Sequence, residues 1–178
     1  MKFLLLHFSD MHFNASTDHI LKKKALILKA VQNQTQECEH IFILITGDIT
    51  YSGKEPEYFA ALEFVESIKK YLEQYSKKTI TLIMIPGNHD CDHSHKNKHV
   101  RETLIKEIQQ NGLKKDDDGT LDFCCEVQQK FFEFEQCYAQ QNFIFTSKLL
   151  KIASFKFDKL EILFKESLIN SSLGKRVC

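Results

Sequence analysis

Three short apolar runs, separated by two segments of helical periodicity, place the tightest limit on how this chain can fold. The runs are Lys2–Phe8, Ile41–Ile45 and Ile80–Ile85, and each is rich in branched residues. Nearly continuous apolar runs of this length are typical of strands buried on both faces of a sheet. His19–Gln36 and Glu57–Tyr75 lie between them and carry apolar residues at helical spacing. We therefore predict an α/β fold in which right-handed crossover helices join a parallel sheet.

The chain changes character after the third apolar run, where a polar stretch follows. Val100–Gln110 and Phe123–Tyr138 have helical spacing, and the acidic run Asp116–Gly119 between them predicts a turn. Ile152–Phe157 and Leu160–Phe164 predict a β-hairpin. We divide the single expected domain into an N-terminal βαβαβ part (1–90), a helical insertion or cap (91–142), and a hairpin with an irregular tail (143–178).

Composition and charge exclude several classes of protein. With 178 residues, 43% of them hydrophobic, the chain can bury one core. The 24 Lys and Arg balance the 24 Asp and Glu, so no net basic field attracts nucleic acid, which stays open only as a substrate. The early apolar run Phe3–Leu6 is too short for a signal peptide or a membrane span. The six cysteines form no CxxC pair, and we expect free thiols in a cytoplasmic protein without membrane contact.

Polar residues follow each of the three predicted strands, as Asp10-Met11-His12, Gly47-Asp48 and Gly87-Asn88-His89-Asp90. The carboxyl ends of parallel strands meet at one edge of the sheet, where functional groups of such folds gather. Residues two apart on an extended segment point the same way, so we expect Asp10 and His12 to reach one point beyond the first strand. Carboxylate and imidazole groups placed in this way are typical of metal ligands.

The second and third clusters offer further groups to such a site. Gly47 permits a sharp turn that presents the Asp48 carboxylate between strand ends, where it can bridge two metal ions. Asn88 offers a carbonyl oxygen, and we expect Asp90 to accept a hydrogen bond from His89 that fixes the tautomer of its ring. Each cluster alone is common at turns, but all three in this order, each after a strand, indicate a functional site.

The three clusters resemble the first three motifs of the calcineurin-like metallophosphoesterases, over residues 1–90. The resemblance implies a metallophosphoesterase-like sheet sandwich flanked by helices. It also implies that Asp10 and His12 bind one metal ion, that Asp48 bridges to a second, and that Asn88 binds the second. His89 is then the catalytic histidine near the leaving group, supported by Asp90.

The reaction that this resemblance implies is metal-dependent hydrolysis of a phosphoester. Two divalent ions would provide a metal-bound hydroxide as nucleophile, and His89 would stabilise or protonate the leaving oxygen. Mixed oxygen and imidazole ligands favour Mn, Fe, Zn or Ni. Asp48 is followed by Ile49–Gly53 and not by the Asp-Arg-Gly typical of protein phosphatases. This continuation looks more like the phosphodiesterase branch of the family.

The chain departs from the family in its second half. The motif set of the family continues with a lone histidine and a Gly-His-x-His turn, whereas this chain has no histidine after His99. We therefore expect the sandwich to lack its C-terminal part. The hairpin should leave an open sheet edge, which favours an oligomer or a partner chain.

Three alternatives to a complete metallophosphoesterase site can be considered. The chain could be a truncated, catalytically incomplete remnant that acts as a binding or regulatory domain. Replacement ligands could come from another chain, from sequence absent here, or from the patch of Cys91, His93, His95 and His99. A polar histidine-rich loop, however, more often contacts solvent than replaces ligands from distant strands. A nucleotide-binding module of Rossmann type is disfavoured, because no glycine follows the first strand.

Overall fold

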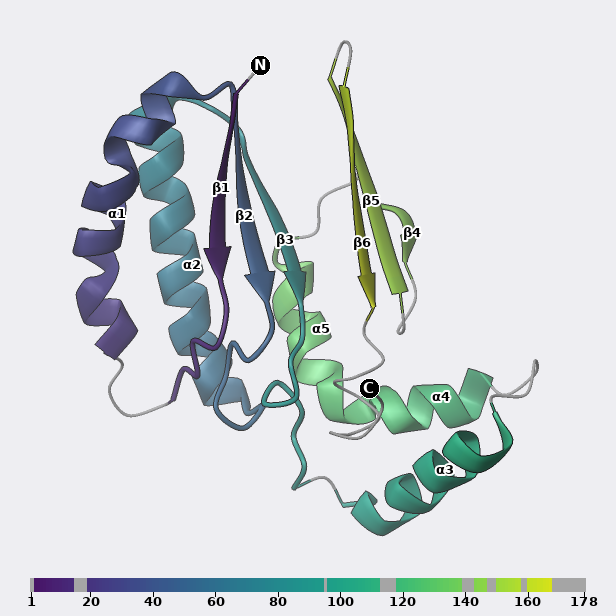
Figure 1. Ribbon diagram of the computed structural model, residues 1–178. Coiled ribbons are helices and arrows are strands. Elements are labelled where there is room, and N and C mark those ends of the chain that lie inside the picture. The colour runs from purple at the N-terminus through teal and green to yellow at the C-terminus, as the bar shows by residue number, and fades with distance from the viewer. Residues whose placement is uncertain are drawn as a thin grey trace.

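A parallel three-stranded sheet forms the centre of the fold (Figure 1). The computed structural model describes residues 2–14, 19–94, 96–112, 118–138, 143–146, 150–157 and 160–167. The strands β1 (Phe3–Phe8), β2 (His40–Thr46) and β3 (Ile80–Ile85) pair in that order, and all are parallel. The predicted α/β fold with a parallel sheet is therefore confirmed.

Helices α1 (His19–Glu37) and α2 (Glu55–Ser76) cover one face of this sheet (Figure 1). Right-handed crossovers that move to the next strand in the same direction place both helices on the same face. On this face Leu6 lies opposite Ile43, and Ile43 lies opposite Leu82 on the next strand. This buried row belongs to the main hydrophobic core, to which α2 adds side chains such as Phe64, Ile68 and Leu72. Both predicted crossover helices are confirmed.

A second, antiparallel sheet lies on the other face of the first sheet (Figure 1). It contains β4 (Phe143–Thr146), β5 (Leu150–Phe157) and β6 (Leu160–Ser167). Phe155 of β5 packs against Phe42 and Ile83 of the first sheet, with the Phe42 and Phe155 ring centroids 5.3 Å apart.

These contacts form a sheet sandwich with helices on its outside. The predicted hairpin is confirmed, whereas β4 was not predicted. The residues that join β5 to β6, 158–159, and the predicted irregular tail after β6, 168–178, lie outside the described residues.

The helical segment that follows β3 and precedes β4 along the chain differs from the sequence prediction at two points. It contains α3 (Lys98–Asn111), α4 (Asp118–Cys125), the 3-10 turn η1 (Glu126–Gln128) and α5 (Gln129–Gln136). The single helix predicted over Phe123–Tyr138 is wrong, because η1 divides it. This break brings the Val127 carbonyl oxygen to 2.8 Å from the Asp92 amide, which ties the helical segment to the loop after β3. The predicted acidic turn is also wrong in its second half, since Asp118 and Gly119 begin α4.

Two general expectations can be checked against the described residues. No disulfide joins any two of the five cysteines among them. Of the helices that the structure describes, none combines the length and apolar character needed to cross a membrane.

Candidate metal centre

The loops after β1 and β2 run alongside each other beyond the strand ends. The His12 amide donates to the Asp48 carbonyl oxygen at 2.9 Å, and the Phe13 amide donates to the Ile49 carbonyl oxygen at 2.8 Å. The Tyr51 amide donates back to the Phe13 carbonyl oxygen at 2.9 Å. Phe13 and Ile49 are fully buried, so the apolar core anchors both loops. The parallel pairing of the strands thus continues into the segments that carry the polar clusters.

Three of the predicted ligand residues have left-handed backbone conformations. The φ angles are +54° at Asp10, +48° at His12 and +52° at Asp48. Residues other than glycine rarely adopt this conformation, and it is concentrated at functional sites where the surrounding structure enforces it. The expectation that Asp10 and His12 point the same way along an extended segment is therefore wrong. The chain turns at both residues, and Asp10 is exposed and accepts a hydrogen bond from the Ser9 hydroxyl at 2.5 Å.

His12, Asp48 and His89 come together beyond the carboxyl ends of the strands. Their candidate ligand atoms lie within 4.8 Å of one another, and each residue is partly buried. The rings of His12 and His89 meet edge to face, with their centroids 4.6 Å apart. Nδ1 of His12 is buried and lacks a hydrogen-bond partner. An orphaned buried imidazole nitrogen on His12, beside the Asp48 carboxylate, fits a bound divalent metal ion.

Two glycines give the Asp48 carboxylate its position. Gly47 has a φ of +89°, which confirms the sharp turn predicted before Asp48. Gly87 lies directly against Asp48, and a Cβ atom at Gly87 would stand 2.1 Å from Oδ1 of Asp48 and 2.3 Å from its amide nitrogen. The close approach allows the His89 amide to donate to Oδ1 of Asp48 at 2.9 Å. The loop after β3 thus packs onto the carboxylate that the loop after β2 presents.

Asp90 does not contact the His89 ring as expected. Its carboxylate is fully buried and accepts hydrogen bonds from the amides of Gly87 at 2.8 Å, Thr50 at 2.9 Å and Ile49 at 3.2 Å. Burial raises the pKa of Asp90 above its ordinary value, and these hydrogen bonds oppose the shift. The expected tautomer-fixing bond between Asp90 and His89 is therefore wrong. Asp90 instead joins the loops after β2 and β3.

The partner of the His89 ring is a backbone carbonyl group. Nδ1 of His89 lies 2.8 Å from the carbonyl oxygen of Tyr51, which leaves Nε2 as the ring atom available to a ligand. Sequence reasoning missed Tyr51, because a backbone acceptor leaves no mark in the residue types. It also missed Glu57, whose buried carboxylate holds the loop that contains Tyr51. A glutamate in the first turn of a helix is a capping signal that could have indicated it.

A cavity of about 370 Å³ opens beside the trio. The residues that line it include Asn88 and His89 of the third polar cluster, and also Tyr51, Lys54 and His93. Asn88 is partly buried and lines this cavity. Its volume is sufficient for a small ligand group next to His89.

The alternative ligand patch after β3 does not assemble in the part of the chain that the structure describes. Cys91, His93 and His99 form no common ligand group there, and His95 lies outside the described residues. Burial raises the pKa of the Cys91 thiol to about 12, so Cys91 holds its proton at neutral pH. The His99 side chain is almost fully exposed, and its Nδ1 atom lies 3.9 Å from Oε2 of Glu102 on α3.

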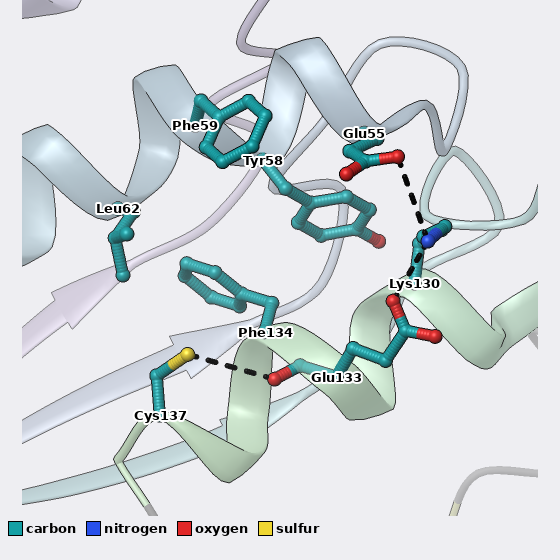
Figure 2. A pocket seen from close by; sticks show the side chains of 8 residues that line it. All are labelled: Glu55, Tyr58, Phe59, Leu62, Lys130, Glu133, Phe134 and Cys137. Carbon is teal, nitrogen blue, oxygen red and sulfur yellow. Dashed lines mark hydrogen bonds and ion pairs between the residues drawn. The ribbon is translucent and has the colours of Figure 1, made fainter.

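A second concave surface lies between α2 and α5 (Figure 2). Its walls are mainly apolar, and Phe59 and Leu62 of α2 face Phe134 of α5 across it. Lys130 closes one end through ion pairs with Glu55 at 3.6 Å and Glu133 at 2.8 Å. None of its lining residues belongs to the three polar clusters, so we assign it no part in the metal centre.

Comparison with known proteins agrees with this geometry. Residues 3–166 match the calcineurin-like phosphoesterase family. The chain is also 27% identical, over 141 residues, to an uncharacterized metallophosphoesterase-like protein, YydB of Bacillus subtilis (strain 168). That alignment covers 75% of this chain and 27% of YydB, so the chain spans about a quarter of the length of this relative. The family match extends well past the three polar clusters to the end of β6. On this match, the chain belongs to the calcineurin-like phosphoesterase family.

Proposed function

We propose that this chain hydrolyses a phosphodiester with the help of divalent metal ions. The observation that carries the proposal is the convergence of His12, Asp48 and His89 at the carboxyl ends of three parallel strands. Divalent metal ions are implied by the family, and when bound they would polarise the phosphoryl oxygens and activate water for attack. The cavity beside Asn88 and His89 supports a substrate with a group attached beyond the phosphate.

The residues of the three loops would hold and orient the metal ions and the ester. His12 offers the orphaned ring nitrogen and Asp48 a carboxylate between strand ends, so both are placed to bind a first ion. We propose that Asp48 and Asn88 would also supply oxygen ligands to a second ion. Asp10 is the ligand with the least support from the geometry, because its exposed carboxylate stands outside the trio.

His89 is the residue that we propose to protonate the leaving oxygen. The Tyr51 carbonyl oxygen can only accept a hydrogen bond, so Nδ1 of His89 must carry a proton. A proton for the leaving group then comes from Nε2 of the doubly protonated ring. We propose that Asp90, which the sequence associated with catalysis, acts by fixing the loops and makes no contact with substrate.

Hydrolysis of bis-p-nitrophenyl phosphate by the purified chain tests this function. We expect turnover with added Mn²⁺, loss of turnover with a chelator, and recovery when metal is restored. A His89→Asn variant should lower kcat by a factor of about 10² to 10⁴, because it removes the proton donor, while it leaves Mn²⁺ affinity nearly unchanged. Parallel assays with the monoester p-nitrophenyl phosphate show whether a diester is preferred.

A binding or regulatory role without catalysis is the second candidate, because the candidate ligands among the described residues gather in one trio, which is few for two metal ions. A folded protein that binds Mn²⁺ but gives no metal-dependent turnover would support this role and contradict the proposed hydrolysis. A loss of Mn²⁺ affinity in His89→Asn would show that His89 is a ligand and not the proton donor.

A further inference from the structure

One buried carboxylate organises the loop that contacts the His89 ring. Glu57 lies in the first turn of α2, and only 6% of its surface is exposed. Its Oε2 atom accepts from the amides of Ser52 at 2.8 Å and Lys54 at 3.2 Å, and Oε1 accepts from the Ser52 hydroxyl at 2.7 Å. Three donors of the loop between β2 and α2 therefore depend on one side chain.

The loop that Glu57 organises presents the Tyr51 carbonyl group. This oxygen lies 2.8 Å from Nδ1 of His89, and the Tyr51 amide is bonded to the Phe13 carbonyl oxygen on the other side. The loop has little freedom to place the oxygen elsewhere, because Gly53, which follows Ser52, packs on the loop after β3. A Cβ atom at Gly53 would stand 2.6 Å from the Asp92 amide nitrogen.

The contact between Tyr51 and His89 selects one form of the neutral ring. A neutral imidazole carries its proton on either nitrogen, and the hydrogen bond made by one nitrogen decides which form is present. Free neutral histidine favours the proton on Nε2. A carbonyl oxygen at Nδ1 demands the opposite form, in which Nε2 carries the lone pair and is the nitrogen that can take up the proton for the leaving group.

We propose that Glu57 is a positioning residue that sets the tautomer and orientation of the His89 ring through the Tyr51 carbonyl group. The step to catalysis rests on the proposed function, but the effect on the ring does not. A helix cap with no further role would account for the burial of Glu57 and its bonds to the loop. Such a cap predicts a less stable protein in which the His89 ring keeps its form.

Measurement of the His89 tautomer in metal-free, ¹⁵N-histidine-labelled protein distinguishes a positioning role of Glu57 from a helix cap with no further role. Long-range ¹H–¹⁵N spectra at a pH where the rings are neutral report which nitrogen of each ring is protonated, and a His89→Asn variant identifies the His89 signals. We expect the Nδ1–H form in the native chain and a shift toward the Nε2–H form in Glu57→Ala. Glu57→Gln should keep the native form, because one amide oxygen can accept both backbone amides while the amide nitrogen donates to the Ser52 hydroxyl.

Glu63→Ala is the matched control, because Glu63 lies on the exposed side of the same helix. It should leave the His89 signals unchanged. If Glu57→Ala does not fold, Glu57→Asp keeps the charge but draws the carboxylate back by one methylene, and it should show the same shift in tautomer. A folded Glu57→Ala or Glu57→Asp protein with the native His89 form would overturn the proposal.

Activity adds a second readout once hydrolysis is established. In Glu57→Ala, kcat should fall by about 10-fold to 100-fold, because the His89 ring loses its orientation. Glu57→Gln should restore most of the loss. A changed tautomer in a chain that never hydrolyses phosphoesters would refute the proposed function and leave the role of Glu57 standing. Normal kcat with a changed tautomer would show that Glu57 sets the form of the His89 ring without affecting catalysis.

Discussion

An Asp48→Asn protein should lose more than about 100-fold in Mn²⁺ affinity and have no measurable hydrolysis of bis-p-nitrophenyl phosphate. Loss of an outer-shell partner of a metal ligand typically costs 10-fold to 100-fold, and loss of a charged ligand should cost more. Asparagine tolerates the left-handed conformation of position 48 and can still accept from the His89 amide. The fold should therefore survive. A change in Mn²⁺ affinity in calorimetric titration then reports the loss of the Asp48 carboxylate as a ligand and not a loss of folding.

The control for this substitution is Asp122→Ala, which removes an exposed carboxylate on α4, outside the three loops. It should keep both Mn²⁺ affinity and turnover. Equal Mn²⁺ affinity in the native and Asp48→Asn proteins would refute the role of Asp48 as a ligand.

The largest loss of stability is expected from Asp90→Ala. This substitution removes the acceptor of three backbone amides, those of Gly87, Thr50 and Ile49, which come from two different loops. Each buried amide left without a partner costs about 1–3 kcal/mol, so the free energy of unfolding should fall by more than about 3 kcal/mol. Urea unfolding followed by circular dichroism measures the change.

Asp90→Asn should have an intermediate effect, because its side-chain oxygen still accepts while its nitrogen faces backbone donors. Asp92→Ala is the matched control, since among the described residues the Asp92 carboxylate accepts from the nearby Ser94 alone. It should change stability by less than about 1 kcal/mol. If Asp90→Ala were as stable as the native chain, Asp90 would not be the group that joins the two loops.

The arrangement of strands and crossover helices could be predicted because burial leaves a periodic mark on the sequence. β2 and β3 are buried on both faces and read as continuous apolar runs, and α2 shows one apolar face. The order of the polar clusters along the chain predicts that His12, Asp48 and His89 lie at one edge of the sheet. In these features, local pattern and tertiary position agree.

Other features of the fold and the site leave no periodic pattern in the sequence. The division at Glu126–Gln128 depends on a contact between Val127 and Asp92, which lie far apart along the chain. The left-handed turn at His12 accompanies pairing between two loops, and the sequence has no glycine at this position that would predict it. Asp90 is adjacent to His89 in the sequence, yet it points to amides of other residues, because a buried carboxylate needs several donors. Contacts between distant backbone groups decided each case.

The most direct test of the metal centre is paramagnetic line broadening by Mn²⁺ in an assigned ¹H–¹⁵N spectrum of the native chain. With less than one equivalent of Mn²⁺, the amide signals of residues 11–13, 47–50 and 87–90 should broaden first and together, because these three loops surround His12, Asp48 and His89. Broadening that begins around His99 on α3, or that spreads evenly over the surface, would contradict a metal centre at the ends of the parallel strands.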